Sequence, residues 1–160
     1  DVDAVTLSPY MGRDSVTPFL GHKGKWAVVL GVTSNPGAED VQFIRTETGR
    51  PLYETVIRRT AEWGRSDELM FVVGATRPAV LAEVRALAPD HFFLVPGVGA
   101  QGGDLQEVMK AGLTPDGGLL INSSRGVLYA GQGDQAIPAA RAAAQSLQRE
   151  MAQAMSAALI

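Results

Sequence analysis

Two loops in the last third of the sequence carry residues suited to binding an anion. Residues 96–104 read PGVGAQGGD, and their glycines, Gly99 among them, let backbone N–H groups approach an anion closely. A helix expected directly after this loop adds a favourable dipole. Residues 122–126 read NSSRG, where the guanidinium of Arg125 is placed to pair with phosphate oxygens beside the N–H groups of Ser124 and Arg125. The two loops together predict a phosphate site.

A third loop carries short neutral polar side chains. Residues 33–38 read TSNPGA, and such groups recognise an uncharged polar ring by hydrogen bonds rather than by acid–base chemistry. The alternative for Ser34 and Asn35 is a helix cap or a turn. Residues 74–76, GAT, follow a similar apolar run, and for them we expect a structural role.

Residue types for acid–base, nucleophilic or metal chemistry are scarce. The lysines are Lys23, Lys25 and Lys110, and we expect the first two to be solvated in a turn. His22 and His91 are predicted in loops before strands, at the end of the sheet opposite the anion-binding loops. The sequence has no cysteine and no close-spaced set of histidines and carboxylates, so we expect no bound metal.

Five short apolar runs must position these loops. The runs are Ala4 to Leu7, Trp26 to Val32, Leu69 to Val73, Phe92 to Val95 and Leu119 to Ile121. Each is nearly continuously apolar, which is typical of strands buried on both faces. Segments with helical spacing of apolar residues lie between them, and this alternation predicts a parallel α/β sheet.

The expected helices have recognisable ends. Pro51 and Pro78 suit first turns, and Asp104 is a plausible N-cap for a helix over residues 105–113. Pro138 opens a last helix, predicted from residue 139 to about residue 158. Its apolar stripe, which we expect to pack on the core, consists of Leu147, Met151 and Met155.

Length favours one of two architectures built from βα units. A barrel of about 250 residues uses about 31 per unit, so five units need about 155 residues, close to the 160 of this chain. We therefore predict an incomplete TIM (β/α)8 barrel of about five βα units, with three units missing on the N-terminal side. The alternative is an open doubly wound sheet in which Gly97-x-Gly99-x-x-Gly102 binds a dinucleotide and Asp116 contacts its ribose.

Composition excludes several classes of partner. There are 14 Lys+Arg against 17 Asp+Glu, the net charge is -3, and the hydrophobic content is 46%. This balance is not that of a general nucleic-acid binder or a protein of anionic membrane surfaces. No apolar run approaches the roughly 18 residues of a membrane span, and no leader is recognisable, so we expect a soluble cytoplasmic protein.

Taken together, the loops resemble those of orotidine 5'-phosphate decarboxylase, in its longer bacterial branch. Five strings occur in the order of that family and cover essentially the whole chain. They are residues 3–12 (DAVTLSPYMG), 33–38 (TSNPGA), 73–76 (VGAT), 95–104 (VPGVGAQGGD) and 121–126 (INSSRG).

The resemblance implies a TIM barrel of which strands 4 to 8 are present, and a cytoplasmic homodimer with its sites near the interface. The family converts orotidine 5'-phosphate to uridine 5'-phosphate (UMP) and CO2 in pyrimidine biosynthesis, with no metal or organic cofactor. By match of motif, Ser34 would bind the pyrimidine and Pro96 would line its pocket. Gln101 and Arg125 would hold the 5'-phosphate, and residues 96–103 would close over the ligand as a lid.

Two departures from the family pattern affect what is expected of the chain. Ser8 stands where this branch usually has Asn, and the family's catalytic Asp-x-Lys-x-x-Asp motif does not occur in the sequence. We therefore expect residues 1–160 to be the C-terminal portion of one decarboxylase domain, with no catalytic residue of its own and no activity alone. The binding-class alternative is a noncatalytic half-barrel that holds a nucleotide phosphate, and the other alternative is a dinucleotide-dependent oxidoreductase.

Overall fold

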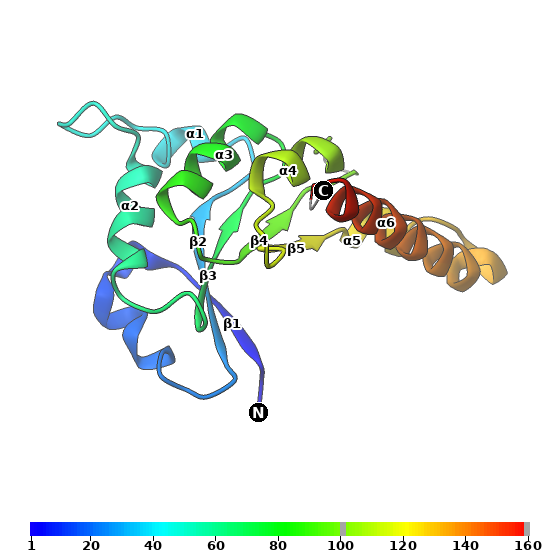
Figure 1. Ribbon diagram of the computed structural model, residues 1–160, viewed down its shortest axis with the longest axis horizontal. Helices are drawn as coiled ribbons and strands as arrows, with labels where there is room; N and C mark the ends of the chain where they lie inside the picture. The colour runs from blue at the N-terminus through cyan, green and yellow to red at the C-terminus, as the bar shows by residue number, and fades with distance from the viewer. Residues whose placement is uncertain (100–101, 159–160) are drawn as a thin grey trace.

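The computed structural model describes residues 1–99 and 102–158, which form one parallel sheet with helices against it (Figure 1). The sheet has five strands in the order β1-β2-β3-β4-β5, and every neighbouring pair is parallel. The strands are β1 (Ala4–Leu7), β2 (Trp26–Val32), β3 (Leu69–Val73), β4 (Phe93–Pro96) and β5 (Leu119–Asn122). This sequential parallel order is that of consecutive units of a (β/α)8 barrel, as predicted, because a doubly wound sheet reverses its strand order.

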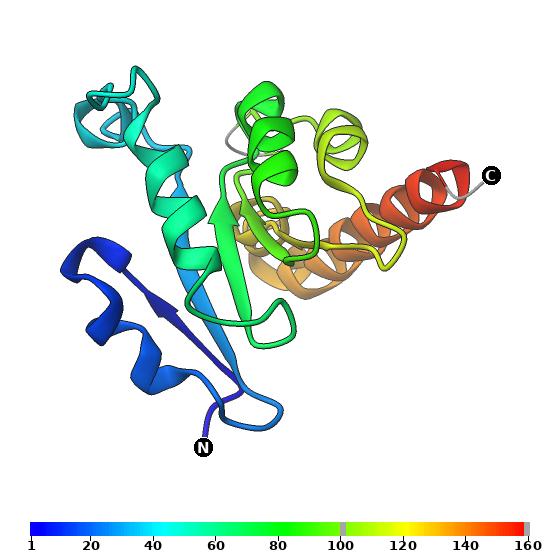
Figure 2. The same cartoon turned by 60° about the vertical axis from the view of Figure 1, so that its left-hand side comes forward.

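Helices connect the strands. The α-helices are α1 (Ala38–Val41), α2 (Leu52–Ala61), α3 (Pro78–Leu87), α4 (Leu105–Gly112), α5 (Ser124–Leu128) and α6 (Ala136–Ala158). Short 3-10 turns are η1 (Pro9–Met11), η2 (Arg13–Ser15), η3 (Thr17–Phe19) and η4 (Gly133–Gln135). The long α6 projects beyond the sheet in Figure 2. None of the described helices has the length and apolarity needed to cross a membrane.

The main core lies between the sheet and its helices. Its fully buried side chains include Phe71 on β3, Phe93 on β4 and Ile57 on α2. Because strand side chains alternate, the other face carries a second, smaller cluster of Val28, Met70 and Val72. This smaller cluster faces the side that the remaining strands of a closed barrel would enclose.

The edge strands differ from the expectation of burial on both faces. All five residues of β3 are buried, but burial alternates along β1 and β5, where Leu120 is 52% exposed. The reason is that β1 pairs only with β2, and β5 only with β4, among the described residues. On the sheet face that carries the smaller cluster, the side chains of β1 and β5 are therefore only partly covered.

The last helix packs on the core through part of its expected stripe. Leu147 and Met151 contact the main cluster, as predicted, whereas Met155 is 37% exposed. Helix α6 begins at Ala136, so Pro138 falls inside its first turn rather than before it. Proline fits there because the first N–H groups of a helix have no intrahelical acceptor.

Candidate phosphate and pyrimidine site

The carboxyl ends of β4 and β5 lie side by side and carry the two anion-binding loops. Pro96 pairs in register with Asn122, so the residues that follow them start from the same level of the sheet. A hollow of about 60 Å³ lies between the two loops and is lined by Pro96, Gly97, Val98, Asn122, Ser123, Ser124 and Arg125. Pockets for drug-sized ligands are typically roughly 300–1,000 Å³, so this space suits one small anion rather than a whole nucleotide.

The first of these loops is closed at its base by its own backbone. The N–H of Gly103 donates to the carbonyl oxygen of Gly97 at 3.1 Å, and that of Gly99 donates to Gly103 at 2.9 Å. Gly97, Gly99 and Gly102 have positive φ angles of 99°, 74° and 88°, a region that favours glycine. The glycines are thus needed for the path of the chain itself.

A helix begins where this loop ends. The Asp104 carboxylate accepts hydrogen bonds from the N–H groups of Gln106 at 2.8 Å and Glu107 at 3.1 Å, which confirms the predicted N-cap. The cap fixes the start of α4 directly after the glycine loop. The loop is therefore anchored at both ends, by β4 and by α4.

Arg125 lies at the rim of the hollow, exposed to solvent. It takes part in none of the ion pairs found among the described residues, so its charge is not already neutralised by a carboxylate. The Ser124 hydroxyl donates to the Asn122 side-chain oxygen at 3.1 Å, which holds the two polar groups together. A cation and a polar rim are thus presented to the same small space.

Not every predicted site residue lines this hollow. Gly99 does not, and its N–H is already bonded to Gly103, so a contact from Gly99 to phosphate stays a prediction. Gln101 and the centre of the expected lid lie outside the described residues. Asn122 and Ser123 also line the hollow; both belong to the second anion-binding loop, but neither was predicted as a phosphate contact. Their position at the end of the last apolar run was the available signal.

Ser34 lies on the other side of Pro96. Its hydroxyl donates to the Pro96 carbonyl oxygen over 3.5 Å, a long hydrogen bond. Since Pro96 also lines the hollow, it connects Ser34 in the loop after β2 to the two anion-binding loops. Asn35 instead accepts from the Thr33 hydroxyl at 2.5 Å, a local turn contact.

The two histidines lie away from this site, whereas Ser8 lines a hollow of about 160 Å³ that is also lined by Thr33, the neighbour of Ser34. The Ser8 side chain accepts from the N–H of Tyr10 at 3.4 Å and caps η1. His22 and His91 precede β2 and β4, at the amino ends of the strands, as predicted. Burial lowers the pKa of His91.

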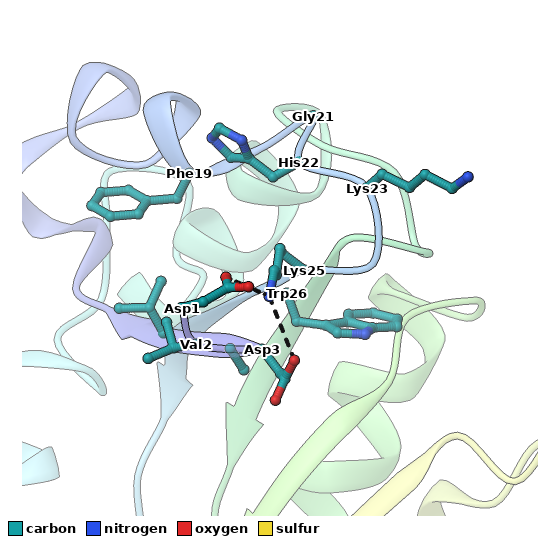
Figure 3. Close-up of a pocket in the computed structure, with 11 residues that line it drawn as sticks. Asp1, Val2, Asp3, Phe19, Gly21, His22, Lys23, Lys25 and Trp26 are labelled. Atoms are coloured by element: carbon teal, nitrogen blue, oxygen red, sulfur yellow. Dashed lines mark ion pairs between the residues drawn. The ribbon is translucent and has the colours of Figure 1, made fainter.

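A larger hollow of about 520 Å³ opens at the amino ends of β1 and β2 (Figure 3). There the Lys25 ammonium pairs with Asp1 at 2.9 Å and Asp3 at 3.5 Å, so Lys25, expected to be solvated, is partly exposed and also takes part in surface ion pairs. The parallel pairing of β1 with β2 brings these charges together. Active sites of βα barrels lie at the carboxyl ends of the strands, so this hollow is at the wrong end of the sheet.

Metal binding finds no support in the part of the chain that the structure describes. No three His, Cys, Asp or Glu side chains there are grouped closely enough to hold a metal ion. The fold and the site together define a protein with part of a βα barrel, in which a small hollow with Arg125 at its rim lies between the loops that follow β4 and β5.

Comparison with known proteins identifies the family. The family model described as orotidine 5'-phosphate decarboxylase / HUMPS family matches residues 1–140. The orotidine 5'-phosphate decarboxylase of Bacteroides fragilis is 46% identical over 159 residues, covering 99% of this chain and 58% of that protein. The chain therefore belongs to the orotidine 5'-phosphate decarboxylase / HUMPS family, and it spans somewhat over half the length of this relative.

Solved structures similar to this chain agree with the assignment to this family. The OMP decarboxylase of Leishmania donovani superposes with a TM-score of 0.83 at 42% identity, over 96% of this chain and 58% of that one. The UMP synthase of the same organism gives a TM-score of 0.85 at 45% identity, over 96% of this chain and 33% of that one. The five strands therefore correspond to an incomplete barrel of this family.

Proposed function

We propose that residues 1–160 form the C-terminal portion of one orotidine 5'-phosphate decarboxylase domain and supply its phosphate and pyrimidine contacts. The observation that carries the proposal is the hollow between the β4 and β5 loops, with Arg125 at its rim in no ion pair with the described residues. Arg125 and Gln101 hold the 5'-phosphate, together with Ser124 and the backbone near Gly99. Pro96 lines the pyrimidine pocket.

Ser34 recognises the pyrimidine ring in this proposal. Its hydroxyl proton is directed at the Pro96 carbonyl oxygen, so its lone pairs are free to accept a hydrogen bond. The N3–H of the pyrimidine is a suitable donor. A nucleotide whose base lacks an N–H at that position, such as cytidine 5'-phosphate, is then bound more weakly.

The reaction breaks the bond between C6 of the pyrimidine and its carboxylate, releases CO2 and leaves a proton to be delivered to C6. The sequence holds no Asp-x-Lys-x-x-Asp motif to stabilise and protonate that carbon. The residues of this chain therefore bind and orient the substrate, and binding energy from the distant phosphate serves catalysis at the ring. The bond-breaking step needs the motif from other βα units.

Binding and turnover test this proposal separately. We expect the 160-residue chain to bind UMP and to release no CO2 from orotidine 5'-phosphate. The same chain preceded by three βα units from the Bacteroides fragilis relative, where the family resemblance places the motif, should be active. A chain that binds UMP but stays inactive in that chimera would favour the noncatalytic half-barrel. Binding of NAD in place of UMP would favour the oxidoreductase.

A homodimer in the cytoplasm completes the proposal. Exposed apolar side chains support a protein interface near the carboxyl ends of β1 and β2, namely Tyr10, Met11, Val41 and Ile44. Sedimentation equilibrium of the active chimera should give twice the chain mass. Changing Tyr10 and Met11 to serine should shift it to monomer, whereas a monomeric unmodified chimera would exclude this part of the proposal.

A further inference from the structure

The segment after β3, residues 74–76, lies between the two halves of the proposed site. The N–H of Gly74 donates to the Val32 carbonyl oxygen at 2.9 Å, at the end of β2. The N–H of Ala75 donates to Pro96 at 3.0 Å, on the same carbonyl oxygen that accepts from Ser34. The Pro96 carbonyl is thus where the loops after β2, β3 and β4 meet.

Gly74 is in close contact with Ser34. A Cβ atom at Gly74 would lie 2.2 Å from the Ser34 hydroxyl oxygen and 2.7 Å from its backbone nitrogen. Both distances are well inside van der Waals contact. The φ angle of Gly74 is not in the positive region, so backbone conformation does not require glycine here. The close approach of Ser34 does.

The neighbouring Ala75 contacts the base of the glycine loop in the same way. A Cβ atom at Gly103 would lie 2.5 Å from the Ala75 Cβ and 2.7 Å from the Gly97 carbonyl oxygen. Ala75 is fully buried and cannot move aside into solvent. One short segment therefore supports the polar loop on one side and the anion-binding loop on the other.

We propose that Gly74 is a positioning residue that sets where the Ser34 hydroxyl lies relative to the pyrimidine ring. This inference rests on the proposed function, in which Ser34 binds the ring. A side chain at position 74 displaces Ser34 from Pro96 and so misdirects its lone pairs. The phosphate contacts at Arg125 lie across Pro96 and do not touch Gly74, so they are spared.

Two ligands separate a positioning role from a general loss of structure. UMP carries the ring and the phosphate, whereas ribose 5-phosphate carries only the phosphate part. With Gly74→Ala we expect UMP affinity of the 160-residue chain to fall about tenfold, the order of one lost hydrogen bond. Affinity for ribose 5-phosphate should be unchanged. Isothermal titration calorimetry measures both.

A double-mutant cycle tests whether Gly74→Ala acts through the Ser34 hydroxyl. In a Ser34→Ala background, Gly74→Ala should weaken UMP binding no further, because the group it displaces is already gone. Gly64→Ala is the structural control, since its Cβ would meet Leu20 at 3.0 Å, near the amino end of β3 and far from the ligand. It should lower stability and leave both affinities unchanged.

The outcomes distinguish the two proposals. If the wild-type chain binds neither ligand, the proposed function fails and this inference fails with it. If the wild type binds UMP and Gly74→Ala binds it equally well, or loses both ligands alike while folded, only this inference fails. Should Gly74→Ala not fold, Ser34→Ala, which leaves Gly74 in place, tests the contact that Gly74 positions: UMP affinity should fall about tenfold and ribose 5-phosphate affinity should be unchanged. Unchanged UMP affinity in Ser34→Ala would overturn the inference.

Discussion

Replacing Arg85 with alanine tests whether one guanidinium holds together the amino ends of β4 and β5. Its three shortest hydrogen bonds go to carbonyl oxygens in separate segments, at 2.6 Å to His91, 2.9 Å to Gly112 and 2.9 Å to Gly118. The guanidinium also lies 3.7 Å from the centre of the Phe93 ring. Burial lowers its pKa to about 10, which leaves it charged at neutral pH.

The expected cost follows from these contacts. Each hydrogen bond contributes about 1 kcal/mol net, and the stacking on Phe93 about 0.5–1 kcal/mol. We therefore expect Arg85→Ala to lower the free energy of unfolding by about 3–4 kcal/mol, or the melting temperature by roughly 10 °C. Arg85→Lys should lower the free energy of unfolding by about 2 kcal/mol, because a single ammonium group cannot donate to all of these separate carbonyl oxygens at once.

Urea unfolding followed by tryptophan fluorescence measures these values. Arg141→Ala, an exposed arginine on α6, is the matched control and should change stability by less than about 0.5 kcal/mol. A loss below about 1 kcal/mol for Arg85→Ala, or wild-type stability for Arg85→Lys, would refute the reasoning.

Three further predictions concern other parts of the molecule. Arg125→Ala should weaken UMP binding roughly tenfold to a hundredfold in calorimetry, with partial retention in Arg125→Lys; equal affinities would remove Arg125 from the site. Asp104→Ala should lower the free energy of unfolding in urea by about 1 kcal/mol, and Asp104→Asn by much less, since an amide oxygen can cap α4 as a carboxylate oxygen does. Equal losses of stability in the two variants would contradict the cap. Burial lowers the pKa of His91; the nearby Asp90 raises it, and Arg85 lowers it further. The folded chain therefore favours the neutral ring. Stability should therefore be full above about pH 6.5, the usual unfolded value, and fall as the pH drops below it. His91→Phe should reduce that fall, and an identical pH profile would contradict the assignment.

The sheet was largely predictable because buried parallel strands are continuous apolar runs. The predicted bounds of β1, β2 and β3 match the structure, and β4 is shifted by one residue, from 92–95 to Phe93–Pro96. The exposure of β1 and β5 was not predicted, since it depends on which strands find two neighbours rather than on local pattern.

Candidate site residues were predictable from local sequence only where they directly follow a predicted strand. Arg125 was expected beside the glycine loop because both follow apolar runs and parallel strands bring their ends together, whereas Pro96 was named through the family resemblance. The role of Gly74 depends on a contact with Ser34, which lies 40 positions earlier in the sequence. Arg85 was missed for a similar reason, because its carbonyl acceptors come from separate loops.

The most direct test of the account is decarboxylation of orotidine 5'-phosphate by two proteins side by side. One is the 160-residue chain, and the other is that chain preceded by the three βα units of the Bacteroides fragilis relative. The account predicts CO2 release by the chimera and none by the chain alone, although both bind UMP. Release by the chain alone, or a folded chimera that binds UMP and releases no CO2, would contradict it.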